Sequence, residues 1–175
     1  MKALTTDRLL LRQWHESDRE PFAAQSADPE VMRYFPKLLT RDEADALIDR
    51  HQVQLAAGEP GLFAVEVRES GAFIGFVGLA VPSFEASFTP CVEVGWRLAR
   101  SAWGHGYATE AALAALDHGF NTLMLDEIVS FTSLPNTRSR AVMERIGMTF
   151  VAEFEHPNLE PGHPLRRHAL YRIRR

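Results

Sequence analysis

The chain of 175 residues has a single cysteine, Cys91, and no long apolar run. One cysteine excludes an intramolecular disulfide and any metal site built from several cysteines, and it fits a reducing compartment. No apolar run approaches the length of about 20 residues that a membrane-spanning helix needs. The first residues, MKALTTDRLLLRQW, lack the apolar core and small-residue cleavage site of a signal peptide. We therefore expect a cytoplasmic protein that neither enters a membrane nor binds a metal.

The sequence also lacks a strong excess of charge of either sign. Its net charge of −4 and pI of about 6.0 disfavour a nucleic-acid partner. The C-terminus is locally basic, and we interpret that basic stretch as a solvated edge and tail. Repeats, low-complexity runs and linkers are missing as well. The length predicts one domain over residues 1–175, and a hydrophobic content of 46% is enough for a sizeable core.

Apolar spacing and turn residues divide the chain into strands and helices. Strands are predicted at 8–14, 63–81 (a hairpin around 69–71), 91–99, 127–134, 150–156 and 166–174. Helices are predicted at 16–35 (interrupted at 28–29), 40–58, 107–123 and 136–148. The order β-α-α-β-β-β-α-β-α-β-β indicates an α/β fold, a mixed sheet with helices on its faces.

Several helix ends carry recognisable signals. Ser17 with Glu20, and Thr40 with Glu43, have the spacing of capping boxes. Gly58 is placed to end the second helix. Near the C-terminus, Asn136 can cap a short helix that Gly147 can end.

The stretch RSAWGHGYATEAA (100–112) places two glycines between a predicted strand and a predicted helix. The first amides of a helix have no intrahelical partner, and with the helix dipole they favour a phosphate at that end. Glycine permits close approach because it has no Cβ. The alternative is a turn that merely links strand to helix. A Walker loop is excluded because no Gly-Lys-Ser/Thr ending is present, and the third glycine of a dinucleotide fingerprint is missing.

The stretches EVGWRLARSAWGHGYATEA (93–111) and FTSLPNTRSRAVMERIGM (131–148) together resemble the GNAT acetyltransferase superfamily. The opening TDRLLLRQW with DPEVMRYF, and the ending RRHALYRI, are similar to its RimJ/RimL-like branch of ribosomal-protein N-terminal acetyltransferases. The resemblance covers nearly the whole chain. It implies a mostly antiparallel mixed sheet with one splayed parallel strand pair, and acetyl-CoA as co-substrate.

The resemblance also implies which residues contact acetyl-CoA. The loop would hold the pyrophosphate through Trp103, Gly104, His105, Gly106, Tyr107, Ala108 and Thr109. The preceding strand would lie beside the pantetheine arm, whose amides would bond to the opened strand edge at Trp96, Arg97 and Leu98. An amide near Trp96 or Arg97 would then polarise the thioester carbonyl. Family loops usually carry Gln or Arg three residues before the first glycine, whereas this chain has Ser101 there, so the expected phosphate contacts are backbone amides.

Acetyl transfer to an amine needs a base, because a lysine amine is almost wholly protonated at neutral pH and an α-amine partly so. Glu93 is the predicted base, and the alternative is an ordinary carboxylate on a polar strand face. Glu85 and His118 are weaker rivals, the latter more typical of a packed or surface histidine. Ser139 is the predicted proton donor, because the tyrosine that many superfamily members use is replaced by Met143.

Two of these assignments have plain structural alternatives. Asn136 would bond to the pantetheine arm, or it is a simple N-cap; Ser139 would lie near the sulfur, or it is a first-turn serine without a catalytic role. The acceptor is expected between the early helices and the C-terminal loop. Candidate lining residues are Arg33, Tyr34, Phe35, His156 and His163.

The predicted function is an N-acetyltransferase that acts on a primary amine, either a protein N-terminal α-amine or a small-molecule amine. The alternative is a non-catalytic acyl-CoA-binding module or sensor, which would keep the glycine loop and Asn136 but would not need Glu93 and Ser139. A nucleotide-binding regulator is disfavoured by the missing lysine and acidic magnesium pattern. The oligomeric state is expected to be a monomer or homodimer.

Overall fold

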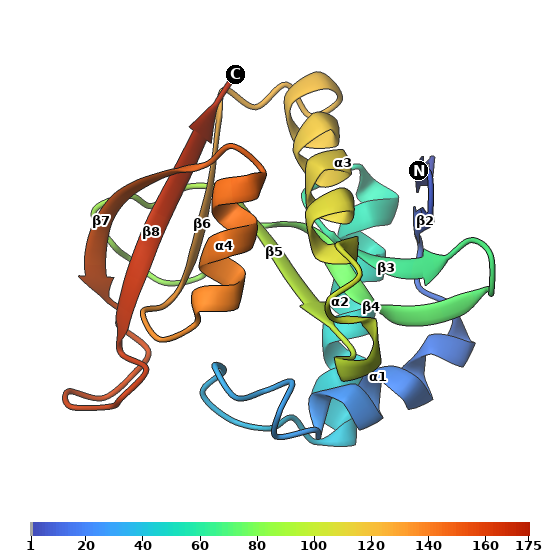
Figure 1. The fold of residues 1–175 in the computed structure, drawn as a ribbon, viewed down its shortest axis with the longest axis horizontal. Coiled ribbons are helices and arrows are strands. Elements are labelled where there is room, and N and C mark those ends of the chain that lie inside the picture. The colour runs from blue at the N-terminus through green and yellow to red at the C-terminus, as the bar shows by residue number, and fades with distance from the viewer. Residues whose placement is uncertain (1) are drawn as a thin grey trace.

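The computed structural model describes residues 2–175 and arranges them as an eight-stranded sheet with helices on both faces (Figure 1). The strand order is β1-β2-β3-β4-β5-β6-β8-β7, and every neighbouring pair is antiparallel except β5 and β6. The strands are β1 (Leu4–Thr5), β2 (Leu9–Arg12), β3 (Leu62–Val67), β4 (Ala72–Ala80), β5 (Glu93–Leu98), β6 (Glu127–Ser133), β7 (Thr149–Glu155) and β8 (Arg167–Arg174).

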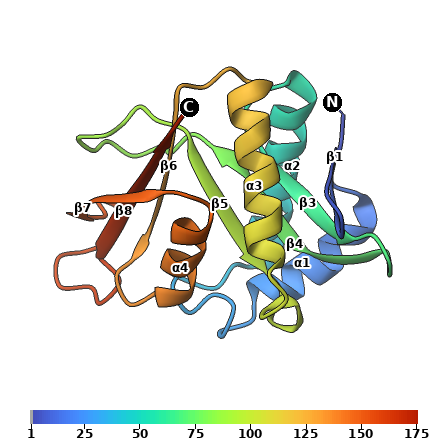
Figure 2. The same cartoon turned by 45° about the horizontal axis from the view of Figure 1, so that its top comes forward.

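Four α-helices cover the sheet: α1 (Arg19–Ser26), α2 (Arg41–Ala57), α3 (Tyr107–Asn121) and α4 (Thr137–Arg145). Figure 2 shows α3 and α4 in front of the sheet, with α1 and α2 behind it. The predicted fold class, the mixed and mostly antiparallel sheet and the order of the main elements are confirmed. Within residues 2–175, each helix is too short or too polar to span a bilayer.

Most of the predicted helix ends are confirmed. The Thr40 side chain accepts a hydrogen bond from the Glu43 N–H, and the Glu43 carboxylate accepts one from the Thr40 N–H, so this capping box forms. Gly58 follows α2 with a φ of 75°, the left-handed conformation that glycine adopts without strain. Gly147 follows α4 in the same way, with a φ of 85°.

The prediction for residues 16–35 is wrong in two respects. The helix ends at Ser26, and residues 29–34 form turns, because Asp28-Pro29 interrupts the pattern. The expected box of Ser17 and Glu20 does not cap it. Instead, Asp18 accepts a hydrogen bond from the His15 N–H at 2.8 Å while it pairs with the buried Arg12 guanidinium. The two-residue strand β1 and the 3-10 turns Glu16–Asp18 and Arg100–Ala102 were too short to leave a periodic signal.

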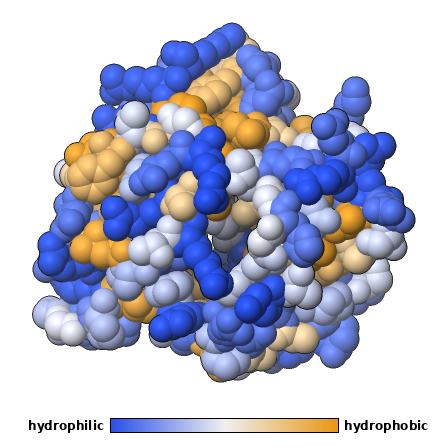
Figure 3. All heavy atoms as spheres, in the orientation of Figure 1, coloured by the Kyte–Doolittle hydropathy of each residue, from blue (hydrophilic) through white to orange (hydrophobic). Residues whose placement is uncertain are grey.

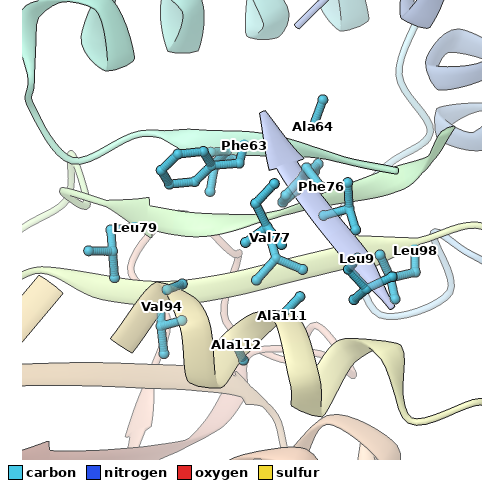
Figure 4. Close-up of a cluster of buried hydrophobic side chains, with 14 of the residues drawn as sticks. Leu9, Phe63, Ala64, Phe76, Val77, Leu79, Val94, Leu98, Ala111 and Ala112 are labelled. Atoms are coloured by element: carbon cyan, nitrogen blue, oxygen red, sulfur yellow. The ribbon is translucent and has the colours of Figure 1, made fainter. Parts of the chain in front are cut away.

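The two faces of β5 differ in character, as the alternation of its residues predicts. Val94 lies against Ala111 and Ala112 of α3 (Figure 4), and Phe63 shares this side of the sheet, because its ring lies 5.7 Å from that of His118 in α3. The side chain of Arg97 points to the other side of the sheet, because its guanidinium carbon lies 5.7 Å from the ring centre of Phe22 in α1. The alternating positions Glu93, Gly95 and Arg97 therefore share the face opposite α3.

A pair of glycines that face each other in β4 and β5 gives a matched stability test. A Cβ at Gly78 would lie 2.3 Å from the Gly61 carbonyl oxygen and 2.8 Å from the Leu62 Cα, both backbone atoms. We expect Gly78→Ala to lower the free energy of unfolding by about 1–3 kcal/mol or more. Its register partner Gly95 has nothing within 4 Å of a built Cβ. Gly95→Ala should therefore change the free energy of unfolding by less than about 1 kcal/mol. Urea unfolding measures both, and equal losses would contradict the packing argument.

Candidate functional site

The parallel strands β5 and β6 are joined only where they begin. Their one register pair sets Glu93 opposite Val129, and the Val129 N–H donates to the Val92 carbonyl at 2.9 Å. The Ser130 hydroxyl adds a bond to the Val94 carbonyl, also at 2.9 Å. Beyond this point β5 continues along β4 and β6 continues along β8, so the two strands diverge (Figures 1 and 2). The predicted splayed pair is confirmed.

The divergence leaves one edge of β5 open. The carbonyls of Val92 and Val94 turn toward β6, so by alternation the backbone groups of Trp96 and Leu98 turn the same way. The Leu98 carbonyl accepts the indole N–H of Trp103 at 2.9 Å. Among residues 2–175, no strand pairs with Trp96 on this side. Figure 3 shows a narrow hollow over β5 in the middle of this face. An open edge of this kind is costly unless a ligand or water bonds to it.

The glycine loop lies at the end of β5 and leads directly into α3. Gly104 and Gly106 have φ values of 83° and 80°, and Gly106 is the N-cap of the helix that begins at Tyr107. L-residues with a side chain rarely adopt this conformation. A Cβ at Gly104 would have no atom within 4 Å, so one side of the loop is free. The loop conformation therefore explains the two glycines, and the free side lies next to unbonded amides of the first helical turn.

Arg8, just before β2, holds the glycine loop from outside. Its Nη1 donates to the His105 carbonyl at 3.0 Å, and its Nε donates to the Glu110 carboxylate at 2.7 Å. Its guanidinium carbon lies 4.8 Å from the ring centre of Tyr107. Although partial burial opposes ionisation of Glu110, hydrogen bonds from Thr6 and Arg8 lower its pKa. Sequence reasoning missed Arg8 and Glu110 because the two are 102 residues apart and no local pattern links them.

Two further guanidinium groups lie against the indole of Trp103. Arg100 and Arg138 have their guanidinium carbons 5.0 Å and 4.9 Å from its ring centre. Arg138 comes from the first turn of α4, so the loop after β5 and the helix after β6 meet here. Glu110 neutralises Arg8 and Glu30 neutralises Arg100, whereas Arg138 forms no ion pair within residues 2–175. Arg138 therefore leaves a positive charge beside the loop, which favours an anion. Arg138 was also missed, because only the three-dimensional fold brings it to Trp103.

Glu93 lies where β5 and β6 part. Its side chain is half-buried, and this burial raises its pKa to about 8. At neutral pH the carboxyl group is therefore mostly protonated, and it becomes a proton acceptor as the pH rises. The two alternative bases considered from the sequence lie elsewhere. Glu85 is exposed in the loop before β5, and His118 is buried on α3 with its ring 5.7 Å from that of Phe63, which confirms a packed histidine.

Asn136 and Ser139 meet at the start of α4. The Asn136 carbonyl oxygen accepts the Ser139 N–H at 3.3 Å, which confirms the N-cap. The Asn136 amide nitrogen donates to the hydroxyls of Thr132 at 2.9 Å and Ser139 at 3.0 Å. Because the Ser139 oxygen accepts this bond, its own hydrogen remains available for donation. Met143, at the position of the usual family tyrosine, is only 1% exposed and belongs to the core.

The residues predicted to line the acceptor site lie in two segments. In the first, Phe35 covers the Arg97 guanidinium at 4.4 Å, whereas Arg33 is exposed beside the ring of Tyr34. In the second, His156 lies 4.5 Å from the ring of Phe84, and His163 accepts the Leu165 N–H at 3.1 Å within its own loop. Burial, and then the charge of His168, lowers the pKa of His156 to about 4. Among these residues, Phe35 lies against the side chain of Arg97 on β5.

Comparison with known proteins gives the following relationships. Residues 8–149 match the family described as the acetyltransferase (GNAT) domain. The uncharacterised N-acetyltransferase YnaD of Bacillus subtilis is 30% identical over 83% of this chain and 81% of its own length. The crystal structure of a GNAT-family acetyltransferase from Bacillus anthracis superposes with a TM-score of 0.80 at 25% identity, covering 99% of this chain and 98% of that one.

A more distant solved structure bears on the narrower branch. RimL, a ribosomal-protein α-N-acetyltransferase in complex with coenzyme A, has a TM-score of 0.79 at 14% identity, covering 99% of this chain and 98% of that chain. At this identity the likeness shows the fold alone. The family relationship is therefore established, whereas the RimJ/RimL-like branch is not.

Burial of Glu93 makes the stability of the protein depend on pH. The carboxyl group ionises near 4.5 in the unfolded chain but near 8 in the folded one. Between these values the folded state binds more protons, so stability falls as pH rises, by up to about 1.4 kcal/mol per pH unit. Glu93→Gln removes this loss. Urea unfolding at pH 5, 6.5, 8 and 9 should show the variant gaining on the native protein up to about pH 8. Glu85→Gln replaces an exposed carboxylate, so its stability should depend on pH as that of the native protein does. If the stability of Glu93→Gln also followed the native pH dependence, a raised pKa for Glu93 would be contradicted.

Proposed function

The chain belongs to the acetyltransferase (GNAT) family, and from that premise we propose that it transfers the acetyl group of acetyl-CoA directly to a primary amine. The observation that carries the proposal is the single register pair between β5 and β6, which opens the edge of β5 beside a glycine loop. A long ligand that carries amides at one end and phosphates at the other can bind here: its amides to the open strand edge, and its phosphates to the free amides of the loop.

The residues present fit acetyl-CoA. The free backbone groups of Trp96 would bond to the amides of the pantetheine arm, and the Leu98 N–H would continue the contact. The predicted contact at Arg97 is not retained, because its carbonyl turns away from this edge and accepts the side-chain amide of Gln25 at 3.0 Å. The amides of Gly104 to Thr109 would hold the pyrophosphate, because no side chain covers Gly104 and the unpaired Arg138 supplies positive charge nearby. His105 stacks on Tyr107 with 5.3 Å between ring centres, which stiffens the same loop.

When bound, acetyl-CoA would supply an activated acetyl group as a thioester. Glu93 would take the proton from the attacking ammonium or amine, directly or through a water molecule. Its raised pKa of about 8 suits this role, since a base works best when its pKa is near the operating pH. The Trp96 N–H would donate to the thioester carbonyl oxygen and so stabilise the negative charge that develops there.

Ser139 would donate a proton to the departing sulfur. Its hydroxyl is oriented by the bond that it accepts from Asn136, and Asn136 is in turn held by Thr132 of β6. Asn136 is therefore proposed as a positioning residue for Ser139. A coenzyme thiol has an ordinary thiol pKa of about 8.5, so weak acid assistance is sufficient for it to leave.

Membership of the family does not identify the amine that accepts the acetyl group. Both sequence-based classes, a protein N-terminal α-amine of the RimJ/RimL-like kind and a small-molecule amine, agree with a base of pKa about 8. We also propose that the protein is cytoplasmic and is a monomer or a homodimer. The alternative function, an acyl-CoA-binding module without catalysis, would have no use for a half-buried carboxyl group at the end of the open strand edge.

Free-thiol release from acetyl-CoA, measured with a panel of amines and short peptides, tests the enzyme. The native protein should release thiol in an amine-dependent manner, and kcat/KM should rise with pH with one break near pH 8, where Glu93 ionises, and a second at the pKa of the amine. Glu93→Gln should lower kcat/KM by about 10²-fold or more and lose the break near pH 8, while the break that belongs to the amine remains. Glu85→Gln should behave as native. Coenzyme binding without release for any amine would favour the binding module.

A matched pair of glycine variants tests the coenzyme loop. Gly104 and Gly71 both have a positive φ, 83° and 69°, and neither has an atom within 4 Å of a built Cβ. Replacement by Ala should therefore cost each a similar backbone strain of about 1–2 kcal/mol. Only Gly104→Ala should weaken coenzyme A binding, by about tenfold or more in calorimetry, because Gly71 lies in the turn between β3 and β4. Equal affinities for the two variants would exclude this loop as the phosphate site.

A further inference from the structure

Arg97 carries a buried charge that no carboxylate of the chain neutralises. The residue is only 7% exposed, and no acidic side chain among residues 2–175 forms an ion pair with it. Its Nη1 donates to the Ser26 hydroxyl at 3.2 Å, but its Nε is buried without a hydrogen-bond acceptor. Three phenylalanine rings surround the guanidinium carbon, those of Phe35 at 4.4 Å, Phe76 at 5.1 Å and Phe22 at 5.7 Å.

Arg12 shows how the same chain treats a buried arginine that is purely structural. It is 8% exposed, and its guanidinium pairs with Asp18 at 2.7 Å and with Glu66 at 2.7 Å. Although burial opposes it, these carboxylates raise the pKa of Arg12, whereas burial lowers the pKa of Arg97 to about 10. An uncompensated buried charge is strongly unfavourable, and cation–π contacts offset only part of that cost. The contrast indicates that Arg97 is left unpaired for a ligand.

Open space adjoins Arg97 on the same face of β5. Glu93, Gly95 and Arg97 alternate along this face, and each step of two residues spans about 6.6 Å. Gly95 occupies the middle of a central strand, yet a Cβ built there would meet no atom within 4 Å. The strand therefore presents a carboxyl group, a bare stretch of backbone and a guanidinium in a row, on the side away from α3.

We propose that Arg97 binds a carboxylate of the acceptor, which makes the acceptor an amine that also carries a carboxylate, with its amine directed along Gly95 toward Glu93. The inference rests on the proposed function and narrows its substrate class. Arg is well suited to the task, because its planar fork matches a carboxylate with two parallel hydrogen bonds and the dry surroundings strengthen them. A polyamine is disfavoured at this place, since its cationic groups would face an unpaired guanidinium.

Pairs of amines that differ only in the acidic group provide the test. α-Amino acids and ω-amino carboxylates of increasing length are compared with their neutral amides, using native protein, Arg97→Met and Arg97→Lys. Because intrinsic amine reactivity differs within a pair, the quantity of interest is the ratio of kcat/KM for acid over amide, and its change between variants. The ratio should fall about tenfold or more in Arg97→Met, with the KM for acetyl-CoA unchanged. Arg97→Lys should keep part of it.

Equal losses for acid and amide in Arg97→Met would overturn the proposal, because a structural role affects both members of a pair alike. Gly95→Val gives a second reading: it should raise the KM of the acid severalfold without changing that of acetyl-CoA, and the opposite pattern would assign the space to the coenzyme.

A protein that binds coenzyme A but acetylates nothing would refute the proposed function while leaving Arg97 testable. Thermal stabilisation by the N-acetyl amino acids, compared with their N-acetyl amides, then replaces turnover as the readout. Stabilisation by the acids in native protein, lost in Arg97→Met, supports the carboxylate site. Absence of any difference between acids and amides overturns it.

Discussion

The register pair of Glu93 and Val129 is the constraint on which the architecture of the site depends. A sheet that paired β5 and β6 along their full length would bury the Trp96 backbone groups and leave no opening. With one pair and the Ser130 bond to the Val94 carbonyl, the strands are fixed at one end and free to part at the other. The two halves of the sheet thus stay in one piece while an edge of β5 remains available.

The elements that follow β5 and β6 give the opening its chemistry. The glycine loop ends β5 and turns into α3, while Asn136 begins α4 after β6, so two helix starts lie at the wide end of the gap. The contact of Arg138 with Trp103 joins them. On the opposite side of β5, Glu93 and Arg97 are both held in protein surroundings that disfavour their charged forms. The same strand therefore separates a polar backbone edge from a face with two perturbed ionisable groups.

Local signals predicted what local interactions determine. Thr40 with Glu43, Gly58, Asn136 and Gly147 act through bonds within a few residues, and each was found from the sequence. The loop glycines and the alternation of β5 were found for the same reason. The helix at 16–35 was overextended because Asp28-Pro29 ends it early. Its N-terminal cap was misassigned because Asp18 pairs with Arg12 of the preceding strand. The contacts of Arg8 with Glu110, and of Arg97 with Phe35, join distant segments and have no pattern in the sequence.

The tie between Arg8 and the glycine loop has a consequence for the order of folding. A contact across 102 residues closes a long chain segment, and such contacts form slowly because the entropy of closure must be overcome first. During synthesis Arg8 leaves the ribosome long before the loop does, and it must wait for most of the sheet before Glu110 and His105 reach it. We therefore expect the loop to become ordered after β2 pairs with β3, whose paired residues are closer in the sequence.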